Sequence, residues 1–223
     1  MKSWFDGEKR DVPHNICPIF LDRQDTALIT VDMHEGHLSG DPDCPCPSPR
    51  GREIITPLNQ FMAQARNLGI PIIHVRSVLR RNGVDEKLYP SAWRMLFPIT
   101  GGEIPNIAEH ALEGTRWNDF SIDVHPEDCI VSTKKRLSAF YPTDLELLLR
   151  NLGIKRVVLT GCVTDCCVLN TAFDAANRDF RVTVVKDLTR GTEHLEDMAL
   201  RIISLHLGLV VESGELLEHW KAQ

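Results

Sequence analysis

The stretch TALITVD, residues 26–32, decides the fold because it is short, apolar and rich in β-branched side chains. These features are typical of a strand that is buried on both faces. It is followed by apolar residues at helical spacing in 52–67 and by a second apolar stretch, IPIIHVR, at 70–76. Two such strands joined through a helix form a parallel crossover unit. The sequence therefore predicts an α/β protein with a parallel sheet.

The same alternation continues to the end of the chain. Further strands are predicted at 128–133, 154–161, 181–187 and 207–213, and further helices at 143–153, 165–178, 193–206 and 214–220. We therefore predict a three-layer αβα fold, with a doubly wound sheet of six parallel strands. In such a sheet, ligands bind beyond the carboxyl ends of the strands.

We expect a single domain over residues 1–223, because this length and 43% hydrophobic side chains suffice for one core. Residues 1–24 are interpreted as an irregular N-terminal extension. Residues 77–127 are too long for an ordinary connection, so we interpret them as a lid or specificity segment.

Composition excludes several classes of partner. The chain has 25 Lys and Arg against 31 Asp and Glu, a net charge of −6, which disfavours nucleic acid and anionic membranes as partners. No apolar stretch approaches the roughly 20 residues that span a bilayer, and the N-terminus lacks the apolar region of a secretory signal. The seven cysteines lack the spacing of a disulfide scaffold. We expect a soluble, cytoplasmic protein with free thiols.

Three residues of different chemistry follow strands whose carboxyl ends share one edge of the sheet: Asp32, Lys134 and Cys167. A thiol at a helix N-terminus and beside an ammonium is favoured as the nucleophilic thiolate. The carboxylate can then transfer protons. This combination predicts covalent catalysis by Cys167.

Three segments, GCVTDCCV (161–168), KKRLSAFYPTDLELLL (134–149) and ITVDMHEGHL (29–38), resemble the isochorismatase-like cysteine hydrolases. This superfamily includes nicotinamidases, N-carbamoylsarcosine amidases, ureidoacrylate hydrolases and biuret hydrolases. The resemblance covers nearly the whole chain from about residue 26. It implies the strand order 3-2-1-4-5-6 and a homo-oligomer, either a dimer or a tetramer.

The resemblance also implies roles for individual residues. Asp32, Lys134 and Cys167 match the catalytic triad of the family. Backbone N–H groups of Thr164 and Cys167 would form the oxyanion hole, in a turn with a cis peptide bond between Val163 and Thr164.

Two neighbours compete for these roles. One step around a helix start turns a side chain by about 100°, so only one of Cys166 and Cys167 can face the site, and the spacing of the family motif implies Cys167. Adjacent side chains at a strand end point to opposite faces. The spacing to Ser138 implies Lys134 in place of Lys135.

Candidate substrate-binding residues surround these positions. His37 is expected to donate a hydrogen bond to the substrate or to stack on it, whereas the alternative is a loop histidine bonded to backbone. The candidate aromatic walls of the pocket are Trp93, Trp117, Phe140 and Tyr141. The alternative for these rings is core packing or a subunit contact.

We expect no metal and no other cofactor. The loop after the first strand offers Asp41, Asp43, Cys44 and Cys46. A Cys-x-Cys pair among prolines lacks the spacing of a closed zinc site, and no paired Cys or His motif follows it.

The resemblance implies a cysteine-dependent amidohydrolase. Its substrate would be a small linear amide or ureido compound of the biuret, triuret or N-carbamoyl type, cleaved at a C–N bond through a thioester with release of ammonia. Three alternatives stay open: vinyl-ether hydrolysis of the isochorismatase type, nicotinamidase activity, and a catalytically silent binding or scaffold protein.

Overall fold

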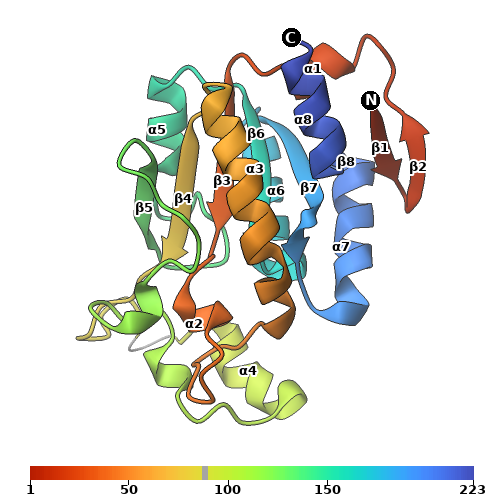
Figure 1. Ribbon diagram of the computed structural model, residues 1–223. Helices are drawn as coiled ribbons and strands as arrows, with labels where there is room; N and C mark the ends of the chain where they lie inside the picture. The colour runs from red at the N-terminus through yellow and green to blue at the C-terminus, as the bar shows by residue number, and fades with distance from the viewer. Residues whose placement is uncertain (87–89) are drawn as a thin grey trace.

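The computed structural model describes residues 1–86 and 90–223, and within them one sheet of eight strands forms the centre (Figure 1). The strands are β1 (Lys2–Phe5), β2 (Glu8–Asp11), β3 (Thr26–Val31), β4 (Ile72–Ser77), β5 (Cys129–Lys134), β6 (Arg156–Cys162), β7 (Arg181–Arg190) and β8 (Gly208–Val211). Their order across the sheet is β2-β1-β8-β7-β6-β3-β4-β5. All neighbours from β8 to β5 are parallel, so the six predicted strands and the order among them are confirmed. The expected count of six for the whole sheet is wrong, because β1 and β2 extend it to eight strands with mixed directions.

The described residues form helices, some of which cover the two faces of the sheet. They are α1 (Cys17–Leu21), α2 (Glu35–Leu38), α3 (Ile55–Asn67), α4 (Ala92–Gly101), α5 (Leu145–Asn151), α6 (Leu169–Asn177), α7 (Glu193–His206) and α8 (Ser213–Lys221). Helices α3 and α8 contribute to one hydrophobic core, and α5, α6 and α7 contribute to the other. This division confirms the three-layer arrangement.

The burial of β3 explains why its sequence lacks polar alternation. All six of its residues are buried. Ala27, Ile29 and Val31 face one core, whereas Leu28 faces the other. Because successive side chains of a strand point to opposite faces, a strand covered on both sides needs apolar residues at nearly every position.

The N-terminal segment is not irregular, which corrects our expectation for it. β1 and β2 form an antiparallel hairpin, and β1 pairs antiparallel with β8. The turn residues Asp6 and Gly7 have φ values of 49° and 81°, as in the type I′ turns that suit two-residue hairpins. Ser3 Oγ donates to the carbonyl of Val210 at 2.9 Å. The hairpin therefore covers the β8 edge of the parallel sheet.

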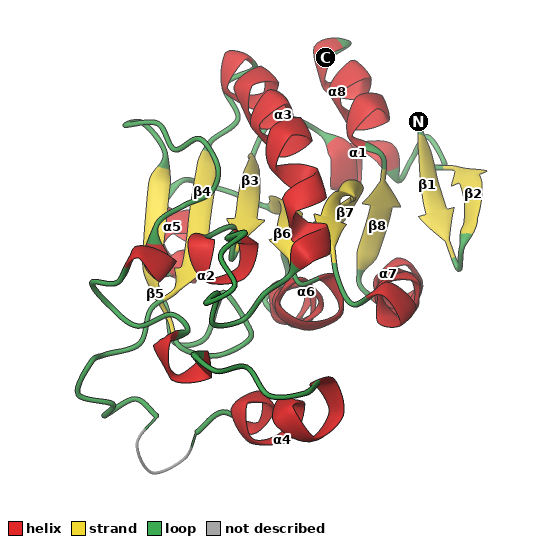
Figure 2. Cartoon of the chain, turned by 60° about the horizontal axis from the view of Figure 1, so that its bottom comes forward, coloured by secondary structure: helices red, strands yellow, loops and turns green. Residues whose placement is uncertain are grey.

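Residues 77–127 cross the carboxyl ends of the central strands. Residues 87–89 of this segment lie outside the described residues; the rest includes α4 and the short 3-10 turns η2 (Ile107–Glu109) and η3 (Arg116–Asn118). The segment meets the loop after β3 through a bridge between His34 and Phe120. Figure 2 shows it beneath the carboxyl ends of β3 and β4.

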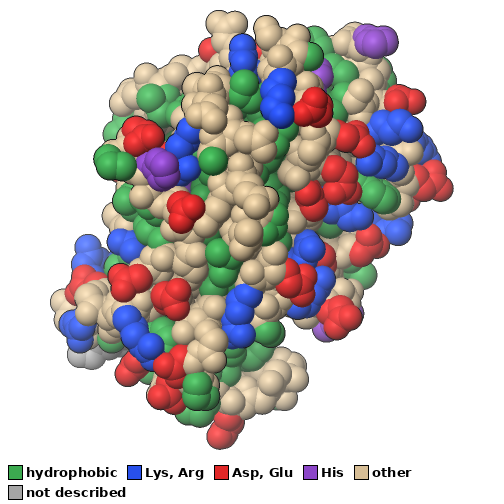
Figure 3. Space-filling view, in the orientation of Figure 1, with side chains coloured by type: hydrophobic (Ala, Val, Ile, Leu, Met, Phe, Trp, Pro, Cys, Tyr) green, Lys and Arg blue, Asp and Glu red, His purple; other side chains and the backbone are tan. Residues whose placement is uncertain are grey.

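The distribution of surface charge and the character of the helices are relevant to binding of nucleic acid or a membrane. Basic and acidic side chains are intermixed over the face seen in Figure 3. No helix among the described residues has the length and apolar character that crossing a bilayer requires.

Candidate active site

Asp32 lies directly after β3 and is fully buried. Its φ of 51° is in the left-handed region, which Asp adopts more readily than β-branched residues. Its Oδ1 accepts hydrogen bonds from the backbone N–H and the hydroxyl of Ser77, at 2.9 and 3.1 Å. The carboxylate is therefore held in one orientation at the edge of the sheet.

Lys134 connects the carboxylate to the thiol. Its Nζ is 2.5 Å from Asp32 Oδ2, 2.8 Å from Ser77 Oγ and 3.5 Å from Cys167 Sγ. Lys134 is only 1% exposed. The structure thus brings together the three residues that the sequence placed at strand ends.

A register shift explains why the Lys134 side chain points inward. Val75 pairs with Val131 and Ser77 pairs with Lys134, so two steps along β4 oppose three steps along β5. Such a bulge changes which face a side chain occupies. Strict alternation from the buried Val131 would instead have put Lys134 on the opposite face.

Cys167 lies in η4 (Thr164–Val168), a short π-helical turn between β6 and α6. The N–H of Val168 donates to the carbonyl of Val163 at 3.2 Å, and such turns are frequent at functional sites. The cis peptide bond joins Cys162 to Val163, so the expected position between Val163 and Thr164 is wrong. The bond lies at the end of the sheet, because β6 extends to Cys162.

The environment shifts the pKa of each group. Burial is the largest single influence on Asp32 and opposes its ionisation, but the Lys134 ammonium, His34 and His37 together outweigh it and lower the pKa of the carboxyl to about 2. Burial likewise opposes the charge of Lys134, but Asp32 and Cys167 raise its pKa. The Cys166 side chain and burial raise the pKa of Cys167, and Lys134 only partly compensates. The thiolate form expected for Cys167 therefore stays a prediction, and the Lys134 ammonium is the contact that favours it.

The two competing neighbours differ in their surroundings from Lys134 and Cys167. Lys135 Nζ lies 3.2 Å from Asp85 Oδ2 and donates to the carbonyl of Val78. Cys166 is half-buried, whereas Cys167 is buried and contacts Lys134. Their positions therefore favour Lys134 over Lys135, and Cys167 over Cys166, as the residues of the candidate active site.

Two functional candidates were missed from the sequence. Ser77 contacts both Asp32 and Lys134, and its place at the end of an apolar strand beside β3 was a usable signal. His110 lies against His37, with the two Nε2 atoms 3.4 Å apart. Nothing in the sequence links His110 to a residue 73 positions away.

The structure separates the expected substrate-binding residues into two groups. His37 is buried, and the Trp93 ring makes an edge contact with His110, with ring centroids 5.0 Å apart. Trp117 is also buried, and its carbonyl contacts His34 Nδ1 at 2.9 Å. These three residues lie near the Asp32 end of the site.

The other two aromatic candidates lie elsewhere. Phe140 packs in the core against Phe180, with centroids 5.8 Å apart. Tyr141 is 60% exposed and lines a surface cavity of about 460 Å³ together with Lys135 and Arg136. Neither ring is brought to the group formed by Asp32, Lys134 and Cys167.

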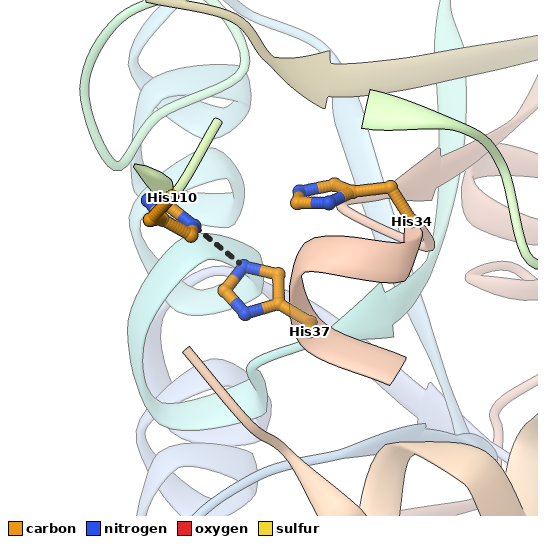
Figure 4. A group of neighbouring side chains, drawn as sticks. All are labelled: His34, His37 and His110. Atoms are coloured by element: carbon orange, nitrogen blue, oxygen red, sulfur yellow. Dashed lines mark hydrogen bonds between the residues drawn. The ribbon is translucent and has the colours of Figure 1, made fainter. Parts of the chain in front are cut away.

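Histidine nitrogens are the strongest candidates for metal ligands among the described residues. His34, His37 and His110 are all buried, and one ring nitrogen from each lies within 4.8 Å of the others (Figure 4). His34 Nε2 is 3.9 Å from Asp32 Oδ1, so this cluster adjoins the buried ion pair.

Comparison with known proteins agrees with this architecture. The family model described as "Isochorismatase domain" matches residues 26–215. A ureidoacrylate amidohydrolase, RutB from Methylorubrum extorquens, is 31% identical over 213 residues, covering 86% of this chain and 82% of that protein.

Solved structures show the same fold. A cysteine hydrolase from Pseudomonas syringae pv. phaseolicola has a TM-score of 0.78 at 20% identity, covering 90% of this chain and 94% of that chain. The pyrazinamidase of Pyrococcus horikoshii, in complex with zinc, has a TM-score of 0.69 at 28% identity, covering 84% and 99%.

Proposed function

The chain belongs to the isochorismatase domain family of hydrolases, and from this premise we propose that it is an amidohydrolase whose nucleophile is Cys167. The observation that carries the proposal is the position of Lys134 Nζ, which contacts both Asp32 Oδ2 and Cys167 Sγ. A thiol, an ammonium and a carboxylate in contact can move a proton and attack a carbonyl.

The first step generates the nucleophile. One proton moves from Cys167 Sγ to Lys134 Nζ while another moves from Nζ to Asp32 Oδ2. This leaves a thiolate, an ammonium and a neutral carboxyl. The relay supplies a thiolate from a buried thiol that is in contact with Lys134.

The thiolate then forms a bond to the substrate carbonyl carbon. Backbone N–H groups of Thr164 and Cys167 stabilise the oxyanion, a type of contact that is worth about 3 kcal/mol per donor. Asp32 returns its proton to the nitrogen as the C–N bond breaks, and ammonia leaves. The product of this half-reaction is a thioester on Cys167.

Water completes the cycle. Asp32 takes a proton from the water molecule, the oxygen attacks the thioester, and the C–S bond breaks with the proton returning to sulfur. Enzyme groups end in their starting protonation states, and the sum of the steps is hydrolysis of one amide bond.

The proposed substrate is a small linear ureido or amide compound of the biuret, triuret or N-carbamoyl type. Cys167 is 7% exposed, which favours a small substrate. The relative from Methylorubrum extorquens is named for a ureido compound, and this supports a carbamoyl group as the part that is recognised. We also propose a homo-oligomer, because α4 exposes Met95, Leu96 and Ile99.

A substrate panel tests the proposal. The purified protein is incubated with biuret, ureidoacrylate, an N-carbamoyl amino acid, nicotinamide and isochorismate, while ammonia and pyruvate are measured. We expect ammonia from a ureido compound, and none from the Cys167→Ser variant. Pyruvate from isochorismate alone would identify a vinyl-ether hydrolase, ammonia from nicotinamide alone a nicotinamidase, and silence throughout a binding protein; each would overturn the proposal.

A further inference from the structure

Three buried histidines meet beside the candidate active site without a role in the proposed reaction. His34 follows β3, His37 lies in α2, and His110 comes from the segment 77–127. Figure 4 shows the rings turned toward one another. Their centroids are 4.7, 4.9 and 6.0 Å apart.

Backbone carbonyls orient two of the rings. His34 Nδ1 is 2.9 Å from the carbonyl of Trp117, and His37 Nδ1 is 2.9 Å from the carbonyl of Cys46. A carbonyl only accepts hydrogen bonds, so both Nδ1 atoms carry the proton and both Nε2 atoms carry a free lone pair. The Gly36 N–H also donates to His34 Nδ1 at 3.2 Å, which requires the other tautomer of that ring. The carbonyl of Trp117 is the shorter contact at 2.9 Å and favours a proton on Nδ1. Metal-binding histidines are commonly held in this way, by a carbonyl on the nitrogen that does not bind the ion.

Hydrogen bonds within the described part of the protein leave two of the four remaining ring nitrogens without a partner. Among the described residues, His34 Nε2 and His110 Nδ1 are buried without a partner. Leaving a buried polar atom unsatisfied costs about 1–3 kcal/mol, so a group that binds His34 Nε2 is favoured. The other two nitrogens, His37 Nε2 and His110 Nε2, lie 3.4 Å apart.

That separation fits a shared ion. Two nitrogens at about 2.0–2.1 Å from one tetrahedral zinc ion stand roughly 3.3–3.4 Å apart. It is also long for a direct N–H···N hydrogen bond. The geometry of His37 and His110 therefore matches that of two ligands of one ion, and the free lone pair of His34 supplies a third ligand.

We infer that His34, His37 and His110 bind one divalent transition-metal ion of the zinc class. Imidazole ligands suit Zn²⁺, Co²⁺, Ni²⁺ and Cu²⁺ and do not suit Mg²⁺ or Ca²⁺. Three histidines leave a fourth position for water or a ligand. This donor set shares no residue with the loop that contains Cys44 and Cys46.

The electrostatic setting supports the inference. All three rings are buried side by side, and neutral imidazole is the form that binds metals. Asp32 faces His34 Nε2 at 3.9 Å and carries negative charge, whereas the Lys134 ammonium is already paired with that carboxylate. An ion held here would polarise a carbonyl or acidify a bound water.

Metal titration tests the site independently of any activity. The Cys167→Ser protein, which the proposed function predicts to be inactive, is stripped with a chelator and titrated with Zn²⁺ by calorimetry and with Co²⁺ by visible absorption. We expect one ion per chain and the spectrum of a tetrahedral cobalt site with no thiolate charge-transfer band. Because the readout is binding, a failure of the proposed function leaves this result unchanged.

Ligand variants complete the experiment. His37→Ala and His110→Ala should each weaken Zn²⁺ binding by more than about 100-fold, since loss of an outer-shell partner alone costs 10–100-fold. The exposed His206 provides the matched control, and His206→Ala should leave binding unchanged. Circular dichroism verifies that each variant is folded. Three results would overturn the inference. The protein with all three histidines could fail to bind one metal ion per chain, or its cobalt spectrum could contain a thiolate band. A folded His37→Ala variant could also bind the ion as tightly as the protein with all three histidines.

Discussion

The Lys134 ammonium lies 2.5 Å from the Asp32 carboxylate, and both residues are at most 1% exposed. The pair links β3 to β5 across β4, which lies between them. Burying two charges is costly, and only good geometry with additional hydrogen bonds compensates. Ser77 supplies those bonds to both partners, so the ion pair is both a structural and a chemical centre.

Replacing one partner should destabilise the protein strongly. Asp32→Asn leaves the Lys134 ammonium buried and unpaired, and we expect the free energy of unfolding to fall by about 3–5 kcal/mol. Urea unfolding at neutral pH measures it. The double variant Asp32→Asn/Lys134→Met removes both charges and should recover much of the loss. A single variant within about 1 kcal/mol of the parent protein would show that the pair is not buried as described.

The two adjacent lysines should differ in their effect on activity. Lys134→Met removes the only ammonium that contacts Cys167 Sγ among the described residues, and we expect amide hydrolysis to be lost. Lys135→Met removes a contact with Asp85 at the protein surface, and should leave kcat within a few-fold. Ammonia release with the substrate found in the panel measures both. Equal activity of the two variants would place the catalytic ammonium elsewhere.

Acid should destabilise the metal-free protein through His34. Burial and the neighbouring His37 lower the pKa of His34 from 6.5 to about 3. As the pH falls, His34 therefore binds a proton in the unfolded chain before it does so in the folded protein. Its contribution to the free energy of unfolding is fully present above pH 6.5 and is lost as the pH falls toward 3. The loss is roughly 1 kcal/mol per pH unit for this one group. Asp32 does not contribute in this window, because its stabilisation is lost only between about pH 4 and 2.

Unfolding curves of the chelated protein at several pH values measure this slope. His34→Gln has no group that titrates there, so its slope between about pH 6.5 and 4.5 should be shallower by that amount. Identical slopes for the two proteins would refute a buried, neutral His34.

The N-terminal hairpin should contribute to stability and not to catalysis. Ser3 Oγ donates to the carbonyl of Val210 and accepts from its N–H at 3.1 Å, in a fully buried position. Ser3→Ala leaves both groups unsatisfied, and we expect a loss of about 1–3 kcal/mol with kcat unchanged. Thermal unfolding measures the loss of stability, and an activity assay measures kcat. A loss of kcat in the folded variant would connect β1 to the site.

Most of the fold could be predicted because the buried strands carry strong local signals. The apolar stretch at β3 and the matching limits of α7 followed from composition and helical spacing. The hairpin was missed because β1 and β2 have four residues each and β2 is exposed throughout. The Asp6-Gly7 pair, typical of a type I′ turn, was the available signal.

The site was predictable only where its residues follow strand ends. Asp32, Lys134 and Cys167 meet as the topology requires. The direction of the pKa shift of Cys167 was not predictable from a helix start, because burial and the Cys166 side chain act to raise the pKa against the Lys134 ammonium. The inward direction of Lys134 depends on a bulge between β4 and β5, and nothing in the sequence of β5 indicates it.

Mass spectrometry of the acyl-enzyme tests the nucleophile most directly. The protein is mixed with a ureido substrate, quenched in acid, and its intact mass measured for Cys166→Ser and Cys167→Ser. We expect an added acyl mass on Cys166→Ser and none on Cys167→Ser, because the Cys167 thiol is the one that contacts Lys134. An adduct on Cys167→Ser that disappears in Cys166→Ser would contradict this and make the neighbouring cysteine the nucleophile.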